Sequence, residues 1–280
     1  MTESLRERQK LPLLMALLIG ACFLYVYHEM FIWLYERYTN PDSHYSHGFL
    51  VPAISGYLVW RKRNELRQMH MTSSLGGLGL VVLALLVHLA GVMTHVFFVS
   101  GFSVFFLVVG LSLYFFGREV TRKVAFPLVF LLFMFPLPIG AITFFSFPLK
   151  LFVANIGSLL VKGFGIPLVR EGAFVRLTNT SLSVGDPCSG IRSIIALMAL
   201  GSLIAYFSPI GMTRKTVLFL SAVPVAIFTN VLRVSVLIVA ASWLGGRWAS
   251  PEHWFHTASG MGVFVISMVL LFMEMKVMEK

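Results

Sequence analysis

Charged residues are scarce in this 280-residue sequence, at 12%, whereas soluble domains carry about 25%. This scarcity excludes an ordinary soluble domain, because hydrophobic residues make up 58% of the chain and its mean hydropathy is +0.85. Apolar segments of roughly 20 residues recur from end to end, and in lipid only helices or closed barrels satisfy the backbone. The segments are continuously apolar instead of alternating, so the sequence predicts an all-α integral membrane protein, a polytopic helix bundle.

Cysteine and acidic residues are scarce as well. The two cysteines are Cys22, inside the first apolar run, and Cys188. We expect Cys22 to be a small buried apolar residue and not the partner of a structural disulfide. Lys and Arg number 22 against 12 Asp and Glu, but they cluster in short groups between the apolar runs. The positive-inside rule expects this clustering, so the charge orients the protein and indicates no nucleic-acid partner.

About eight spans follow from the apolar runs and the basic clusters. The first run is longer than a signal-peptide core, so we expect it to be retained. The expected spans are 11–28, 48–60, two within 71–117 that turn near Thr94 and His95, 124–145, 189–207, 216–243 and 257–273. Residues 146–165 are expected along the membrane interface. Both termini are then cytoplasmic, and residues 1–280 form a single multi-pass domain.

Three polar stretches, 36–47, 166–187 and 244–254, fall on the external side in this topology. The middle stretch alternates polar and apolar residues. This alternation predicts a short hairpin-like insertion that leads into Cys188.

The sequence GDPCSGIRS places Cys188 at the expected start of a span. Asp186 resembles an N-cap and Pro187 suits the first helical position, so we expect Cys188 in the first helical turn. Arg192 then lies one turn below it on the same face. The helix dipole and Arg192 both favour a thiolate. The pattern fits either a reactive nucleophile or a small cysteine at a helix start.

Arg233 is an isolated charge deep within an apolar run. Such an arginine costs at least about 2.5 kcal/mol on insertion scales and normally faces the bundle interior or a wet cavity. Asn230 lies three residues earlier on the same face and could hold it. About 15 Å of helix separates Arg233 from Trp243, so either the helix ends earlier or Cys188 sits in a recess. A structural partner between helices is the alternative interpretation.

His256 opens the last span from the external side, with His253 one turn before it. A histidine at a membrane boundary can be an interfacial anchor. However, the thiol, the arginine and the histidine come from three consecutive spans, which usually pack as neighbours. Cys188, Arg233 and His256 can therefore converge.

With these residues assembled, the sequence resembles the exosortase and archaeosortase family of multi-pass membrane cysteine transpeptidases. The resemblance rests on CSGIRS at 188–193, NVLRV at 230–234, HTASG at 256–260 and YSHGFLVPAISGYLVWRKR at 45–63. Each motif is short, but the four stand in family order and cover most of the chain.

The resemblance implies a Cys/Arg/His active site, which carries over to Cys188, Arg233 and His256; the spacing to Gly260 selects His256 over His253. It implies an enzyme of the bacterial cytoplasmic membrane, without a cofactor, whose active site faces the external side. The substrates are proteins with a C-terminal motif, a hydrophobic helix and a basic tail, typified by the PEP-CTERM signal of bacteria that export polysaccharide. A thioester intermediate then passes the substrate to an unidentified acceptor nucleophile.

Four further residues have supporting assignments. We expect Arg192 to tune the thiol and Asn230 to orient Arg233. His44 and His47 belong to the first motif without an assigned catalytic role, and they either line the substrate entrance or pack.

Two other functions stay open at this point. In a transporter or channel, Arg233 and the histidines would bind an anion, and replacing Cys188 would be tolerated. In a metal-dependent intramembrane hydrolase, chelators would inhibit and thiol alkylation would not. The imidazole ligands would be those of His44, His47, His253 and His256. The position of Cys188 favours the transpeptidase, with the lipid bilayer and the sorted proteins as partners.

Overall fold

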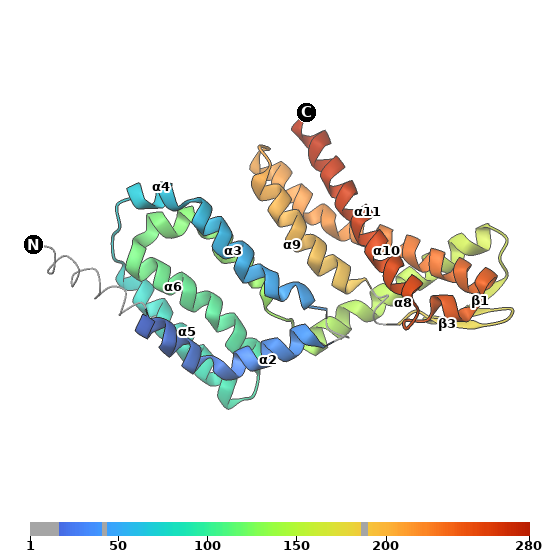
Figure 1. The fold of residues 1–280 in the computed structure, drawn as a ribbon, viewed down its shortest axis with the longest axis horizontal. Helices are drawn as coiled ribbons and strands as arrows, with labels where there is room; N and C mark the ends of the chain where they lie inside the picture. Colours follow the sequence, from blue (N-terminus) through green and yellow to red (C-terminus); the bar gives the residue numbers. More distant parts are fainter. Residues whose placement is uncertain (1–16, 41–43, 186–189) are drawn as a thin grey trace, which may run out of the picture. The chain divides into compact units, whose positions relative to one another are not determined.

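The computed structural model describes residues 17–40, 44–185 and 190–280. These residues are mostly helical with one small antiparallel sheet (Figure 1), which confirms the expected fold class. Five described helices are long and apolar enough to cross a membrane, or six if one bent pair is counted as a span. Two shorter apolar helices, Ala125–Met134 and Ile191–Phe207, lie below that length. Length and composition therefore support fewer spans than the eight expected.

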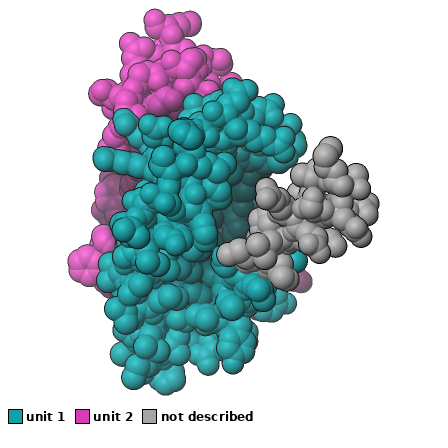
Figure 2. Space-filling model, turned by 90° about the vertical axis from the view of Figure 1, so that its left-hand side faces the viewer, with its two compact units in different colours: residues 1–136 teal, residues 137–280 magenta. Residues whose placement is uncertain are grey.

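The chain divides into two compact units, Met1–Pro136 and Leu137–Lys280 (Figure 2). Unit 1 begins with a bent pair, Leu17–Val26 and α2 (His28–Thr39), which meet at 67°. The unit continues through η1 (Ser46–Phe49), α3 (Leu50–Arg61), α4 (Arg63–Gln68), α5 (Leu75–Met93), α6 (Phe97–Lys123), α7 (Ala125–Phe130) and η2 (Leu131–Met134). The turn between α5 and α6 falls at Thr94 and His95, as predicted.

The bend in unit 1 is stabilised by buried polar groups. Tyr27 lies at the bend, and its hydroxyl is 2.9 Å from Ser103 Oγ. His88 Nε2 donates to the carbonyl of Val26 at 3.0 Å, and His88 Nδ1 is 2.8 Å from Ser100 Oγ. A break in a helix frees backbone groups that need partners in an apolar setting. The carbonyl of Val26 therefore receives from His88 a hydrogen bond that a continuous helix would have supplied.

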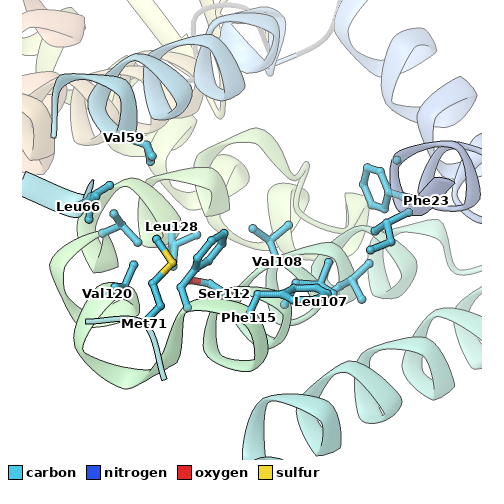
Figure 3. A pocket seen from close by; sticks show the side chains of 15 residues that line it. Phe23, Val59, Leu66, Met71, Leu107, Val108, Ser112, Phe115, Val120 and Leu128 are labelled. Atoms are coloured by element: carbon cyan, nitrogen blue, oxygen red, sulfur yellow. The ribbon is translucent and has the colours of Figure 1, made fainter. Parts of the chain in front are cut away.

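Unit 1 also holds an apolar cavity of about 600 Å³ (Figure 3). Phe23, Met71, Leu107, Phe115 and Leu128 are among its lining residues. The one hydroxyl in the lining, that of Ser112, is 2.8 Å from Thr121 Oγ1. Because the lining contains no titratable side chain, this cavity offers no general base.

Unit 2 is organised around one long helix (Figure 1). Its elements are α8 (Ile139–Gly163), β1 (Leu168–Glu171), β2 (Phe174–Leu177), β3 (Ser181–Ser183), α9 (Ile191–Phe207), α10 (Met212–Leu244), η4 (Gly246–Ala249) and α11 (Trp254–Glu279). α10 packs against α8, α9 and α11. It contributes Val234 and Leu237 to one buried cluster and Leu218 and Ala222 to another. Any group at the centre of α10 is therefore surrounded by the rest of the unit.

The polar stretch before Cys188 forms the only sheet in the described residues. The strands are antiparallel in the order β1-β2-β3, with Leu168 opposite Leu177 and Phe174 opposite Ser183. Val175 at the centre is fully buried. The expected hairpin is thus correct, with a third strand added at the side that leads toward Cys188.

Two expected segments differ in the structure. The predicted span 124–145 is interrupted, because Pro136 and Pro138 lack N–H donors and cannot continue a helix; Pro138 is instead the N-cap of α8. The segment 146–165, expected along the interface, lies mostly within α8, which is long and apolar enough to span. The predicted span 48–60 is represented by α3, which has 12 residues and is shorter than a usual crossing of about 20.

Candidate active site

Arg233 and Asn230 lie on the buried face of α10. The exposed fraction is 9% for Arg233 and 1% for Asn230. The two residues are three positions apart, close to one helical turn. The structure thus confirms that the isolated arginine faces the interior of unit 2, with the amide beside it on the same face.

The guanidinium of Arg233 lies against the first turns of α11. Its Nη2 donates to the carbonyl of His256 at 3.4 Å, and its Nε donates to Ser259 Oγ at 3.5 Å. Ser259 Oγ in turn donates to the carbonyl of His256 at 2.7 Å. Both arginine contacts are long for hydrogen bonds. Together they place the guanidinium beside the turn that carries His256.

Gly260 makes this close approach possible. A Cβ atom at position 260 would lie 3.2 Å from Arg233 Nη2 and 3.3 Å from Cζ. The guanidinium therefore packs directly against the backbone of Gly260, where a side chain would obstruct it. The His-x-x-x-Gly spacing that selected His256 in the sequence thus has a structural reason: the glycine four residues after His256 makes room for the guanidinium.

His256 is buried, with an exposed fraction of 6%. Its Nδ1 is 3.1 Å from the carbonyl oxygen of Ala249 in η4. A carbonyl only accepts, so Nδ1 carries the proton and Nε2 carries the lone pair of the neutral ring. This tautomer suits a general base that acts through Nε2.

His253 has a different role from His256. It is the N-cap of α11, and its Nδ1 accepts from the backbone N–H of Phe255 at 3.3 Å. Its ring also packs on Trp248, with centroids 4.6 Å apart. Because its side chain caps the helix, His253 is explained by structure alone.

Gly190 packs against Asn230. Gly190 adopts a left-handed conformation (φ 85°) and is the N-cap of α9. A Cβ there would lie 2.7 Å from Asn230 Nδ2. Cys188, the predicted nucleophile, lies outside the described residues. The described chain resumes two residues after Cys188, in contact with the amide that neighbours Arg233.

The helix start corrects the prediction for Arg192. Because α9 begins at Ile191 with Gly190 as its N-cap, Asp186 is not the N-cap of this helix. The positive φ of Gly190 does not continue a helix toward lower numbers. The argument that placed Arg192 one helical turn below Cys188 on the same face is therefore wrong. Arg192 is half-buried in the first turn of α9.

His44 and His47 belong to unit 1. Burial lowers the pKa of His47, while a hydrogen bond with the backbone of Phe133 acts in the opposite direction. The neighbouring Gly48 packs on the ring of Tyr38, whose hydroxyl donates to the carbonyl of Met134 at 2.6 Å. Gly48, directly after these histidines, is thus packed within unit 1.

No group of three His, Cys, Asp or Glu side chains able to hold a metal ion occurs among residues 17–40, 44–185 and 190–280. His253 and His256 each bond to a backbone group of their own region. The described geometry therefore does not gather the four-histidine ligand set.

Sequence reasoning missed three contributors: Ser259, the carbonyl of Ala249 and the left-handed Gly190. Ser259 belongs to the HTASG motif without having been assigned a role, whereas the Ala249 carbonyl has no signal in the sequence, because every residue has a main-chain carbonyl. Gly190 had one, since a glycine just before an apolar run is a plausible helix boundary.

A model of the transmembrane exosortase family matches residues 35–273. The chain belongs to the transmembrane exosortase family. The match covers most of the chain and includes every element of the arginine site from Gly190 to Gly260. Exosortases process proteins that carry a PEP-CTERM signal. No curated protein matches the chain, and no solved structure does so. Family membership and multi-pass membrane character are therefore established.

Proposed function

We propose that this exosortase is a cysteine transpeptidase with Cys188 as nucleophile, His256 as general acid and base, and Arg233 as the oxyanion-stabilising group. The observation that carries the proposal is the position of the Arg233 guanidinium, seated on Gly260 beside His256. Covalent geometry supports it, because two residues span at most about 7 Å. Cys188 therefore stays close to Gly190, which packs on Asn230.

The first half of the reaction forms a thioester. The thiolate sulfur of Cys188, whose proton passes to His256 Nε2, attacks the carbonyl carbon of the scissile peptide bond. The negative charge that develops on the carbonyl oxygen is stabilised by Arg233, whose guanidinium has five N–H donors in a fixed fork. The C–N bond then breaks, and the leaving amine takes its proton from His256.

The second half releases the thiolate. An acceptor nucleophile, an amine or water, loses its proton to His256 and attacks the thioester carbon. The C–S bond breaks, the new acyl bond remains with the acceptor, and the proton returns to sulfur. Neither half requires a cofactor, because every proton is carried by His256.

We also propose that the site faces the external side of the bacterial cytoplasmic membrane, with both termini in the cytoplasm. The substrates are proteins with a C-terminal motif, a hydrophobic helix and a basic tail. The hydrophobic helix would lie in the bilayer against the enzyme and hold the motif near Cys188. This arrangement fits a catalytic group at the first turn of a membrane helix, as His256 is in α11.

The test follows a tagged reporter with a PEP-CTERM tail, co-expressed with the full chain in a membrane-bearing host. We expect the wild type and Cys22→Ala to shorten the reporter and Cys188→Ala to leave it intact. Cleavage that persists in Cys188→Ala and stops with a chelator would instead favour the metal-dependent hydrolase. If the wild type, Cys22→Ala and Cys188→Ala all leave the reporter intact, and anion transport requires Arg233, the transporter would be favoured.

A further inference from the structure

β3 is an edge strand of the sheet, and among the described residues only β2 pairs with it. The backbone N–H groups of Leu177 and Val184 donate to Thr180 and Ala173 across the β2-β3 pair. These bonds determine which residues of β3 point their main-chain N–H and C=O groups toward β2 and which point them away, because the two directions alternate along a strand. Leu182, opposite Val175, therefore points its main-chain groups toward β2. The groups of Ser181 and Ser183 point to the other side, away from the sheet.

That side of β3 is open in the described structure. Ser181 and Ser183 are exposed. No backbone hydrogen bond outside the strands involves either residue among the described positions. Unpaired groups of this kind are a template for another extended chain.

The edge also leads to the proposed active site. Ser183 is five residues before Cys188, so the thiol-bearing residue lies within about 18 Å of it. β3 contacts η4, the element whose Ala249 carbonyl holds His256. Val184, directly after the strand, is buried with an exposed fraction of 2%, which anchors this end of β3. The edge and the catalytic groups are thus parts of one region of unit 2.

We propose that the edge of β3 binds the substrate segment on the amino-terminal side of the scissile bond as an added β-strand. The proposal rests on the function proposed above. A peptide held as a strand is extended, with its carbonyl groups exposed for attack, and main-chain hydrogen bonds supply affinity without a demand on side chains. The small side chains at positions 181 and 183 leave room for the residues of the bound strand.

Proline substitutions test the edge selectively. Ser183→Pro removes an outward N–H without touching the bonds to β2, and edge strands tolerate proline at such positions. Ser183→Ala keeps the N–H and removes only the hydroxyl. The matched control is Arg170→Pro, because alternation in β1 points the groups of Arg170 to the opposite edge of the same sheet.

We expect Ser183→Pro to raise the reporter concentration needed for half-maximal cleavage about tenfold, the scale of one lost hydrogen bond together with the desolvation of its partner. Ser183→Ala and Arg170→Pro should stay within about twofold of wild type. Alkylation of Cys188 by a small reagent, in a Cys22→Ala background, should proceed at the wild-type rate in all three. Wild-type cleavage by Ser183→Pro, or equal losses in Ser183→Pro and Arg170→Pro, would overturn the proposal.

Hydrogen exchange provides a readout that does not depend on turnover. With Cys188→Ala and the same reporter, the amides of Ser181 and Ser183 should exchange more slowly than without the reporter, while those of Leu168 and Arg170 should not change. Unchanged exchange at Ser181 and Ser183 would refute substrate binding at the edge of β3, even if cleavage requires Cys188. Slowed exchange in β3, together with cleavage that persists in Cys188→Ala, would instead refute Cys188 as the nucleophile and support substrate binding at the edge of β3.

Discussion

Gly260 determines where the guanidinium of Arg233 can lie. The arginine projects from α10 onto α11, and the contacts that it makes there with Ser259 and the carbonyl of His256 are long, at 3.5 and 3.4 Å. Long contacts orient weakly. The bare backbone of Gly260 therefore limits how closely the charge can approach the turn that carries His256.

We therefore expect Gly260→Ala to impair catalysis without impairing the fold. The new methyl group would lie 3.2 Å from Arg233 Nη2 and would displace the guanidinium by a few tenths of an ångström. Displacement of a catalytic group by about 1 Å can cost a hundredfold in rate, so we expect a loss of about tenfold in kcat with little change in KM. Reporter cleavage at several substrate concentrations measures both.

The control for this prediction is Gly262→Ala, two residues along the same helix. Nothing lies within 4 Å of a Cβ atom at position 262. Replacing glycine by alanine inside a helix raises helix propensity in both variants, so neither should be less stable than wild type. A thermal midpoint that falls in Gly260→Ala, with an unchanged kcat, would assign Gly260 to packing instead of positioning.

At the scale of elements, α5 and α6 form a close helix pair built on glycine. A Cβ atom on Gly77 would lie 2.4 Å from the backbone nitrogen of Tyr114 and 2.7 Å from the carbonyl oxygen of Gly110. Backbones of membrane helices approach this closely only where small residues meet. Gly79, on the same helix, has nothing within 4 Å of its Cβ position.

Gly77→Ala should accordingly destabilise unit 1, and Gly79→Ala should not. The extra methyl group meets backbone atoms that cannot rotate away, and overpacking of this kind typically costs about 1–3 kcal/mol. Thermal unfolding of the detergent-solubilised chain measures the difference between the two variants. Equal midpoints would mean that α5 and α6 can separate without cost, which would contradict the close packing.

The elements that sequence reasoning located correctly are those with long apolar runs and clear ends. α10 and the start of α11 were predicted to within four residues, because 216–243 and 257–273 are bounded by polar stretches, whereas α11 continues six residues beyond its predicted end. The region 124–165 was divided wrongly, since Pro136 and Pro138 outweigh the hydropathy that suggested a continuous span. Arg233 and His256 were recognisable from isolated polar residues in apolar runs. The role of Ser259, although it lies in the HTASG motif, and that of the Ala249 carbonyl depend on packing between elements that no local pattern encodes.

At the scale of the whole molecule, the length of α10 answers the question of how deep Arg233 lies. Arg214 donates to the carbonyl of Met278, and Lys215 donates to that of Tyr206 at 3.3 Å. The start of α10 and the ends of α9 and α11 therefore meet at one end of unit 2, which carries these two cations. Arg233 is 19 residues beyond Arg214, about 28 Å along a helix. This nearly equals the hydrocarbon thickness of about 30 Å. If the cationic end is cytoplasmic, Arg233 lies at the external boundary and α10 continues beyond it.

Cysteine labelling tests this orientation. Three helices, α9, α10 and α11, separate the exposed turn at Thr178 from the C-terminal Lys280. With three crossings the two positions lie on opposite sides of the membrane. In a background with Cys22→Ala and Cys188→Ala, a membrane-impermeant maleimide should label Thr178→Cys in intact cells, and Lys280→Cys only after permeabilisation.

The short helix α9 makes this labelling decisive. Its 17 residues are at the lower limit for a crossing. If α9 does not cross, Thr178→Cys and Lys280→Cys would be labelled from the same side, and Gly190 at the start of α9 would lie on the opposite side of the membrane from His256. A permeant maleimide that labels both variants equally provides the control for accessibility. Labelling of Lys280→Cys in intact cells would therefore refute the proposed placement of Arg233 and His256 at the external boundary.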